Sequence, residues 1–387
     1  MTTRKLTRRE FLKLSAMAGG SALLASCGGG GGGGGAALPD LTTGANIPMD
    51  ALLAAVEAEG KVVNPIAMPR DWAGFDEIFH ILTDEYGMTL NELSPEFGSA
   101  DELEAIRANR DAPGPQAPDT IDIGIGYTTT ATDEGLLAKY KVATWDSIPA
   151  GFKHPDGFWF VHYYGVLCFE TNTNLIANVP TDWPDLLKAE YRNMVGIAGD
   201  PTASNEAVST VLAAGLSRTN NDIGTAAQAG LEFWAEMNQI GNLLPVTVNA
   251  GTLASGETPI GIEWDYLALP ARDTLAGNPP LEVLVPDTGI IAGPYSGGIS
   301  AFAPHPYGAR LFQEVVFSDA GQLAHLKKYA HPARFDDMVA RGVIPAEVMA
   351  TLPPAEYYAR ATTLTVEQFA AAKEYIAANW RSVVLGE

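Results

Sequence analysis

The sequence predicts an α/β fold, because apolar strands and amphipathic helices alternate along most of its 387 residues. Short apolar runs end in turn residues, stretches with one apolar helical face lie between them, and we detect no internal repeat. Strands separated by helices are typical of mainly parallel sheets that are covered on both faces. About 340 residues follow the low-complexity N-terminus, which is enough for two lobes of ordinary domain size.

The first elements are expected in the order helix, strand, helix, helix, strand. A helix over 49–58 ends at Gly60, which suits the left-handed backbone of a helix C-terminus. A strand over 61–67 precedes a helix whose apolar face carries Phe75, Ile78, Phe79, Leu82 and Tyr86. A capping box over 99–102 opens the next helix. Residues 120–127 are expected to form a strand that leads into a threonine-rich loop.

The same alternation continues to the C-terminus. Further strands are expected over 165–169, 194–198, 260–264, 281–285 and 299–303. An apolar stripe between two of them predicts a helix and comprises Val208, Val211, Leu212 and Leu216. A second capping box, at Thr365 and Gln368, opens the last helix. The Pro- and Gly-rich segment 109–118 is expected to be a surface loop.

The N-terminus predicts export. Arg8 and Arg9, followed by Phe11-Leu12-Lys13, match the twin-arginine consensus, and the apolar stretch 14–26 is too short to span a bilayer. The run Leu24-Ala25-Ser26-Cys27 resembles a bacterial lipobox, which would make 1–26 the signal peptide and Cys27 the lipidated first residue of the mature chain. An ordinary cleaved signal that contains a cysteine is the alternative. Residues 27–47, which open with eight glycines, are expected to be a flexible tether.

The charge excludes one class of partner. The formal net charge is −22, and removal of 1–26, which carry five basic residues and one acid, leaves −26. Nucleic-acid binding requires a basic surface, so we exclude it. Cys168 lies in an apolar run and is expected to be a buried, inert thiol, so no disulfide framework is expected.

Several passages, in this order, resemble the bacterial periplasmic solute-binding proteins of ABC importers, in particular the iron, polyamine, thiamine and phosphonate type. They are YGV at 164–166 before NTNL at 172–175, WPDLL at 183–187 with VGIAGDP at 195–201, GETPIG at 256–261, and APHP at 303–306 with SDAGQ at 318–322. No single passage is specific, but their shared order is.

The resemblance implies a two-lobed periplasmic binding protein type II fold, with a central mainly parallel sheet in each lobe and hinge strands between. Lobe 1 would comprise 48–163 plus 292–387, and lobe 2 would comprise 164–291. The lobes would close by hinge motion over a small-molecule ligand, and the closed form would be read by the permease subunits of an ABC importer. The protein is expected to be a monomer without a cofactor, held at the outer face of a membrane or in the periplasm by a lipid on Cys27.

Loops that follow strands are the expected place for a ligand in an α/β sheet. These loops supply the candidate ligand-binding residues Arg70, Asp71, Trp72, Tyr127, Tyr164, Ser204, Asn205, Trp264, Asp265, Tyr266 and Tyr295. Rings and carboxylates together suit an amine, such as a polyamine. Arg70 and the helix start at Ser204 suit an anionic group, so an aminophosphonate is also considered. Structural roles compete: Trp72 could cover a helix, Trp264 could be core, and Asp265 could cap a helix.

Three other functions were weighed. Ferric-binding relatives carry two adjacent tyrosines where this chain has Asp265-Tyr266, so an Fe(III)-binding importer protein is the alternative with an incomplete ligand set. Polyamine-binding relatives carry an acid on the returning crossover, which 291–295 lacks. No G-x-S-x-G, H-E-x-x-H or phosphate-binding glycine loop occurs, and the six histidines have no metal-ligand spacing. We therefore expect no enzyme, no catalytic residue and no metal; an exported cofactor enzyme and a surface structural protein are less favoured.

Overall fold

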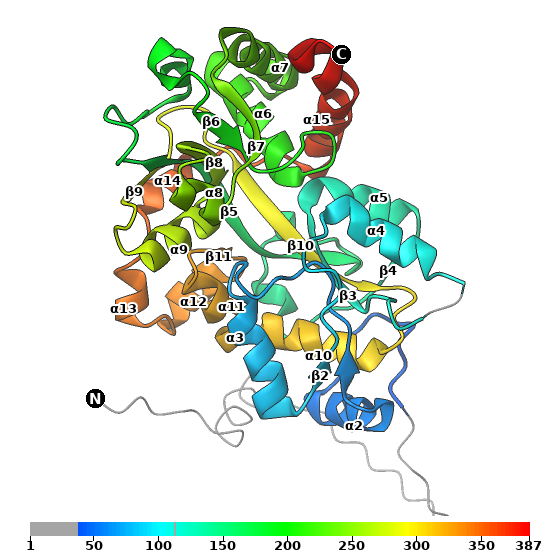
Figure 1. Ribbon diagram of the computed structural model, residues 1–387. Helices are drawn as coiled ribbons and strands as arrows, with labels where there is room; N and C mark the ends of the chain where they lie inside the picture. The colour runs from blue at the N-terminus through cyan, green and yellow to red at the C-terminus, as the bar shows by residue number, and fades with distance from the viewer. Residues whose placement is uncertain (1–37, 112–113) are drawn as a thin grey trace, which may run out of the picture.

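The computed structural model describes residues 38–111 and 114–387. Figure 1 shows them as two halves, with long strands running from one half to the other. The predicted signal peptide, Cys27 and most of the glycine-rich tether lie outside the described residues. Within the described ranges, no helix has both the length and the apolar character needed to cross a bilayer.

One mixed sheet connects the halves. In the described part of the chain its main path is β3–β10–β5–β8–β6–β7, with β4, β9 and β11 paired at its sides. The first part of β5 (Trp159–Asn172) pairs antiparallel with β10 (Ala292–Ser300) as far as Val166. From Leu167 onward β5 pairs antiparallel with β8 (Ile260–Trp264) instead. The change of partner within one strand makes β5 a member of both halves.

The first half contains the N-terminal elements and the segment that follows β10. Its strands are β1 (Val62–Val63), β2 (Thr89–Leu90), β3 (Thr120–Gly124) and β4 (Leu137–Ala138). Its helices are α2 (Met49–Glu59), α3 (Phe75–His80) with a π-helical turn over Ile81–Glu85, α4 (Ser99–Ala108), α5 (Thr128–Asp133), α10 (Pro306–Val316) and α11 (Asp319–Leu326). The first turn of α4 is joined to β3, because Ser99 Oγ accepts from the Gly124 N–H at 3.0 Å and Glu102 Oε2 accepts from the Asp122 N–H at 3.0 Å.

The second half is built on a tightly packed pair of helices. It contains β6 (Val195–Ile197), β7 (Leu243–Thr247), β9 (Leu281–Leu284), α6 (Asn205–Arg218), α7 (Ile223–Ile240), α8 (Ala250–Ser255) and α9 (Asp265–Leu275). Glycines allow α6 and α7 to approach closely, since a Cβ on Gly215 would lie 1.8 Å from the carbonyl oxygen of Ala226. Helix α6 is buried along most of its length.

The C-terminal segment touches both halves. It comprises β11 (His331–Pro332), α12 (Phe335–Arg341), α13 (Ala346–Met349), α14 (Ala355–Arg360), α15 (Val366–Asn379) and a π-helical end over Trp380–Leu385. Helix α15 packs on α6 and α7, as Figure 1 shows, and its Phe369 fills the space beside Gly126 in the first half. Residues 292–387 were predicted to belong to lobe 1 as a whole. Because α15 in this segment also packs on helices of the second half, that boundary remains a prediction.

The structure confirms the α/β class and shows that the sheet is mixed. Among the named strands of the described residues, β1–β2, β6–β7 and β6–β8 are parallel pairs, and every antiparallel pair includes β5 or β10. The predicted parallel pairing is therefore found among the strands within each half. The antiparallel pairs come from the two hinge strands, because β5 leaves the first half and β10 returns to it. Cys168 is buried and free, as expected.

Candidate functional site

Two paired glycines mark the place where the halves meet. Gly165 of β5 and Gly293 of β10 are opposite each other in register. A Cβ on Gly293 would lie 2.0 Å from the ring of Trp264, and one on Gly165 would lie 2.4 Å from Asp265 Oδ1 and 2.5 Å from the ring of Tyr266. The missing side chains therefore let aromatic residues of the second half lie directly on the crossing strands.

Five aromatic side chains gather at this place, and we call them the aromatic cluster: Trp72, Tyr163, Trp264, Tyr266 and Tyr295. Trp72 meets Tyr266 and Tyr295 edge-on, both at 5.6 Å between ring centroids. Tyr163 stacks on Tyr295 at 5.8 Å, and Trp264 stacks on Tyr266 at 6.3 Å. The cluster joins a loop of the first half, both crossing strands and the second half, so any separation of the halves would open it.

A chain of hydrogen bonds runs from the cluster into the first half. Trp72 Nε1 donates to the Tyr163 hydroxyl at 2.5 Å, and this hydroxyl donates to Asp122 Oδ2 at 2.5 Å. The other carboxylate oxygen of Asp122 lies 3.1 Å from His162 Nδ1. Burial, together with the negative charge of Asp122, raises the pKa of Tyr163 well above its usual value, so the phenol keeps its proton.

The second half contributes the start of α6. Ser204 caps this helix, with its Oγ accepting from the Ala207 N–H at 3.3 Å. Asn205 packs against Gly124 of the first half so closely that a Cβ there would lie 2.2 Å from Asn205 Cγ. Glu206 Oε1 accepts from the Trp264 N–H at 2.7 Å. Burial, and then the neighbouring Glu263, raise the pKa of Glu206 well above its usual value.

Several buried polar groups at the cluster have hydrogen-bonding capacity to spare. The Tyr266 hydroxyl and Ser296 Oγ have no hydrogen-bond partner among the described residues. Burial raises the pKa of Tyr295 well above its usual value. The Trp264 indole N–H and the Asn205 side-chain amide, which lie near Tyr295, also have no hydrogen-bond partner among the described residues. Buried polar groups are normally paired, so unpaired ones at an interface between two halves suit a polar ligand.

Three of the predicted residues lie outside the cluster. Arg70 is held by Glu92 and Asp76 at 2.6 and 2.8 Å with a side chain that is 43% exposed, and Asp71 is also exposed. Tyr164 lies apart from the cluster, with its ring 4.7 Å from His331. Of the predicted ligand residues, the structure therefore brings together Trp72, Asn205, Trp264, Tyr266 and Tyr295, with Ser204 beside them.

Two predicted residues take intermediate positions. Asp265 accepts from the Val166 N–H at 3.1 Å and from the Tyr358 hydroxyl at 2.7 Å, so its carboxyl holds the strand crossing rather than facing the rings. Burial raises the pKa of Asp265 to about 7. Tyr127 links the halves, because its hydroxyl donates to the Ala203 carbonyl at 2.5 Å, and Lys373 Nζ lies 3.4 Å from its ring centroid.

Sequence reasoning did not identify four residues of the site: Asp122, Tyr163, Glu206 and Ser296. Asp122 is the one charged residue in the apolar strand TIDIG, which was an available signal. Tyr163 is adjacent to the predicted Tyr164, and neighbouring strand residues point to opposite faces. Nothing in the sequence alone decides which of the two faces the second half.

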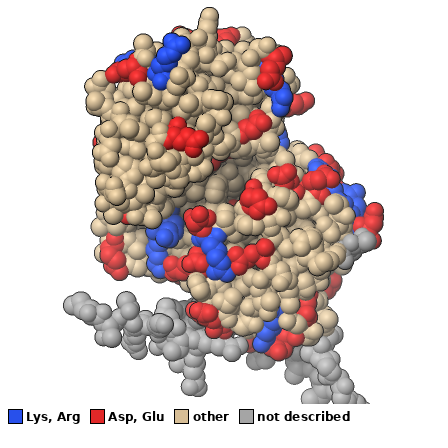
Figure 2. Space-filling view, in the orientation of Figure 1, with Lys and Arg blue, Asp and Glu red and all other residues tan. Residues whose placement is uncertain are grey.

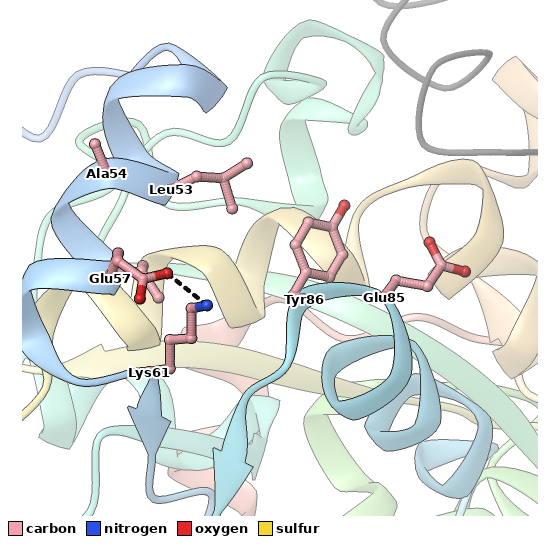
Figure 3. A pocket seen from close by; sticks show the side chains of 7 residues that line it. Leu53, Ala54, Glu57, Lys61, Glu85 and Tyr86 are labelled. Atoms are coloured by element: carbon pink, nitrogen blue, oxygen red, sulfur yellow. Dashed lines mark ion pairs between the residues drawn. The ribbon is translucent and has the colours of Figure 1, made fainter.

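A separate pocket of about 280 Å³ lies in the first half, between α2 and the π-helical turn that follows α3 (Figure 3). Leu53, Ala54, Val56, Glu57, Lys61, Glu85 and Tyr86 line it. Lys61 Nζ pairs with Glu57 at 2.5 Å across its floor. This pocket shares no residue with the aromatic cluster and none with the second half, so closure of the halves would not change it. Figure 2, by contrast, shows a recess where the two halves meet.

Residues 119–355, more than half of the chain, match the family model of the bacterial extracellular solute-binding proteins. The chain belongs to this family. Its members are the solute-binding components of ABC importers, which act outside the cell with a small-molecule ligand and a permease. A search of curated proteins gives no match to this solute-binding protein.

Solved structures confirm the fold of this solute-binding protein. The periplasmic binding protein AfuA from Actinobacillus pleuropneumoniae, with fructose-6-phosphate bound, superposes with a TM-score of 0.65 at 18% identity, covering 84% of this chain and 98% of that one. Iron-bound HitA from Pseudomonas aeruginosa gives 0.64 at 16%, covering 83% and 99%. The spermidine/putrescine protein PotD from Streptococcus pneumoniae gives 0.54 at 15%, covering 82% and 99%. At these identities the likeness shows the fold alone.

Proposed function

We propose that this solute-binding protein captures a small organic amine, such as a polyamine, between its two halves and delivers it to an ABC permease. One observation carries the proposal: five aromatic rings converge between the halves beside the buried carboxyl groups of Asp122 and Glu206. Among the described residues, none of these five rings has a lysine or arginine over its face. No lysine or arginine of the described chain therefore competes with a ligand cation for these rings.

Cation binding fits this site better than anion binding. A ring face attracts an ammonium group by about 0.5–2 kcal/mol, and more when water is excluded. The two features that suited an anion are both compromised, because Arg70 is held by two carboxylates at the surface and the first turn of α6 carries the acid Glu206. An amine is therefore favoured over an aminophosphonate.

The site is less suited to the alternative ligand, Fe(III). The Tyr266 hydroxyl lies in the aromatic cluster, whereas the Asp265 carboxyl binds Val166 and Tyr358, so the two adjacent side chains do not converge on one point. In the described residues, no three His, Cys, Asp or Glu side chains are placed to hold a metal ion. Transport is also the role that we propose for the chain in preference to catalysis.

Several contacts join the two halves and would be lost if the halves separated. Trp72 meets Tyr266, Tyr127 binds Ala203, and Gly124 abuts Asn205. In this structure the rings pack on one another, so a ligand would replace ring–ring contacts with ring–cation contacts. A ligand that contacts both halves binds the closed form better and shifts the population toward it.

We further propose that the mature chain begins at Cys27, carries a lipid there, and is exported by the twin-arginine route. The sequence run Leu24-Ala25-Ser26-Cys27 supports the lipid, and the glycine run after it supports a tether. Mass spectrometry of the membrane fraction should find an acylated N-terminal cysteine. Cys27→Ser should release the protein from the membrane without changing its ligand affinity, and a Cys27→Ser protein that stays bound would refute the anchor.

A thermal-shift panel tests the ligand class. We expect putrescine, spermidine or another organic amine to raise the melting temperature in a dose-dependent way, since ligand at 100 times its dissociation constant stabilises by about 2.7 kcal/mol. Fructose-6-phosphate, 2-aminoethylphosphonate and ferric citrate serve as competing classes. Native protein that is denatured should also release an amine detectable by mass spectrometry.

Paired tryptophan variants locate the effect. Trp72→Ala should abolish most of the amine-induced shift, whereas Trp145→Ala, which removes another half-buried tryptophan of the first half, should leave the shift unchanged. A shift produced by ferric citrate or a sugar phosphate and by none of the amines would refute the proposed ligand class.

A further inference from the structure

The ring of Trp72 is held by one hydrogen bond that its own loop does not supply. The loop backbone is anchored separately, because His325 Nδ1 lies 2.6 Å from the Ala73 carbonyl, which can only accept. Burial lowers the pKa of His325 to about 4, so a neutral imidazole donates there. The indole N–H of Trp72, by contrast, has the Tyr163 hydroxyl as its partner. Loss of that hydroxyl would release the ring while leaving the loop backbone in place.

A β-bulge explains how Tyr163 and His162 reach the same carboxylate. Along β5 and β10, Tyr295 pairs with Tyr163 and Ser296 pairs with Val161, so His162 is an extra residue in β5. Consecutive residues of a regular strand point to opposite faces, but a bulge can re-aim a side chain. Here Asp122 Oδ2 accepts from Tyr163 and Asp122 Oδ1 faces His162, whose Nε2 lies 2.9 Å from Gln313 Oε1.

The chain of groups is rigid because it is buried. Asp122 is 3% exposed, and Tyr163, His162 and Gln313 are 0% exposed. A Cβ on Gly297 would lie 1.7 Å from His162 Nε2, so the imidazole has no room to turn toward β10. The Tyr163 hydroxyl, which accepts the hydrogen bond from Trp72 Nε1, is therefore held in place by buried groups of the first half.

We propose that Asp122 and Tyr163 are positioning residues that set the orientation of the Trp72 ring and increase its attraction for a cationic ligand. The positioning role is argued from the hydrogen-bond geometry alone. The effect on cation binding rests on the proposed function. A phenol that donates to a carboxylate is a better acceptor, because hydrogen bonds in a buried chain polarise one another. The indole N–H then donates more strongly, which leaves more negative charge on the ring face that attracts a cation.

Tyr163→Phe should reveal the role, since it removes the hydroxyl and keeps the ring that stacks on Tyr295. We expect the affinity for putrescine to fall about two- to tenfold, the range for loss of one hydrogen bond. Affinity for 1,4-butanediol, which has the same chain length without charge, should change less, so selectivity for the amine decreases. Asp122→Asn keeps the Tyr163 hydroxyl and should give a smaller loss in the same direction, and it carries the test if Tyr163→Phe does not fold.

A matched control exists in the same half. The Tyr140 hydroxyl donates to Glu314 Oε1 at 2.6 Å, and the Tyr140 side chain is fully buried. Tyr140→Phe therefore removes a buried tyrosine–carboxylate hydrogen bond of the same kind, away from the aromatic cluster. It should lower the melting temperature but leave the affinity for putrescine and its ratio to 1,4-butanediol unchanged.

Nuclear magnetic resonance separates the positioning from the ligand class. The indole N–H resonance of Trp72, assigned by its loss in Trp72→Phe, should move upfield in ligand-free Tyr163→Phe and stay in place in Tyr140→Phe. A resonance that does not move would overturn the positioning role whatever the ligand is. A moved resonance with unchanged amine selectivity would overturn the effect on cation binding. If the wild type binds no amine, the proposed function fails and the resonance still decides the positioning.

Discussion

Gly293→Ala tests the packing of the aromatic cluster on the crossing strands. The added Cβ would lie 2.0 Å from Trp264 Cη2 and 2.3 Å from Cζ2, whereas ordinary contacts begin at 3.4 Å. Trp264 is 0% exposed, and its backbone N–H is bound by Glu206, so it cannot swing into solvent. The ring would have to move by about 1–1.5 Å and push Tyr266, which stacks on it. Overpacking of this kind costs about 1–3 kcal/mol.

Urea unfolding measures this cost, and small-angle scattering shows whether the halves separate to relieve it. We expect a lower midpoint, weaker binding of putrescine and a larger radius of gyration. Gly151→Ala is the control, because a Cβ at Gly151 meets nothing within 4 Å, and its free energy of unfolding should stay within about 0.5 kcal/mol of wild type. Wild-type stability, shape and affinity in Gly293→Ala would refute the packing.

Two more predictions concern the groups that hold the halves together. Burial raises the pKa of Asp265 from 3.8 to about 7, so the folded state binds a proton that the unfolded state releases, and the free energy of unfolding should fall as pH rises through this window. Asp265→Asn should flatten that fall in urea unfolding measured from pH 4 to 8, and an unchanged slope would contradict the assignment. Tyr127→Phe loses the bond to the Ala203 carbonyl and should weaken putrescine binding about two- to tenfold with little change in stability, measured by calorimetric titration. Equal affinity would show that this bond does not favour the closed form.

Local signals in the sequence predicted most of the elements. Gly60 ends α2 with φ of 100°, and Thr365 with Gln368 forms the capping box that opens α15. Helix α4, by contrast, takes Gly98 as its N-cap, because Ser99 Oγ binds the N–H of Gly124 instead of capping its own helix. The signals at Gly60 and Thr365 depend on neighbouring residues only, so they can be read without the fold, whereas the role of Ser99 depends on a residue that is distant in sequence.

Two features depend on residues that are distant in sequence: the direction of a strand and the side of the strand to which a given side chain points. Alternation of helices and strands does not show that β5 and β10 cross between the halves in opposite directions, so it does not predict the antiparallel pairs that these two strands add. The rule that ligands lie beyond the ends of strands did point to Trp72, to Trp264 at the end of β8 and to Tyr266 in the first turn of α9, because that rule depends on topology alone. Tyr163 was missed because a β-bulge at His162 decides to which side of β5 the Tyr163 side chain points, and this bulge depends on pairing with β10.

The crystal structure of the protein grown with putrescine, or with the amine released on denaturation, is the most direct test of where the solute binds. We predict density enclosed between Trp72, Tyr266 and Tyr295, with its ammonium group over a ring face and the two halves in contact around it. Density in the pocket between α2 and the turn after α3, or an aromatic cluster that stays closed and empty at saturating amine, would contradict the account.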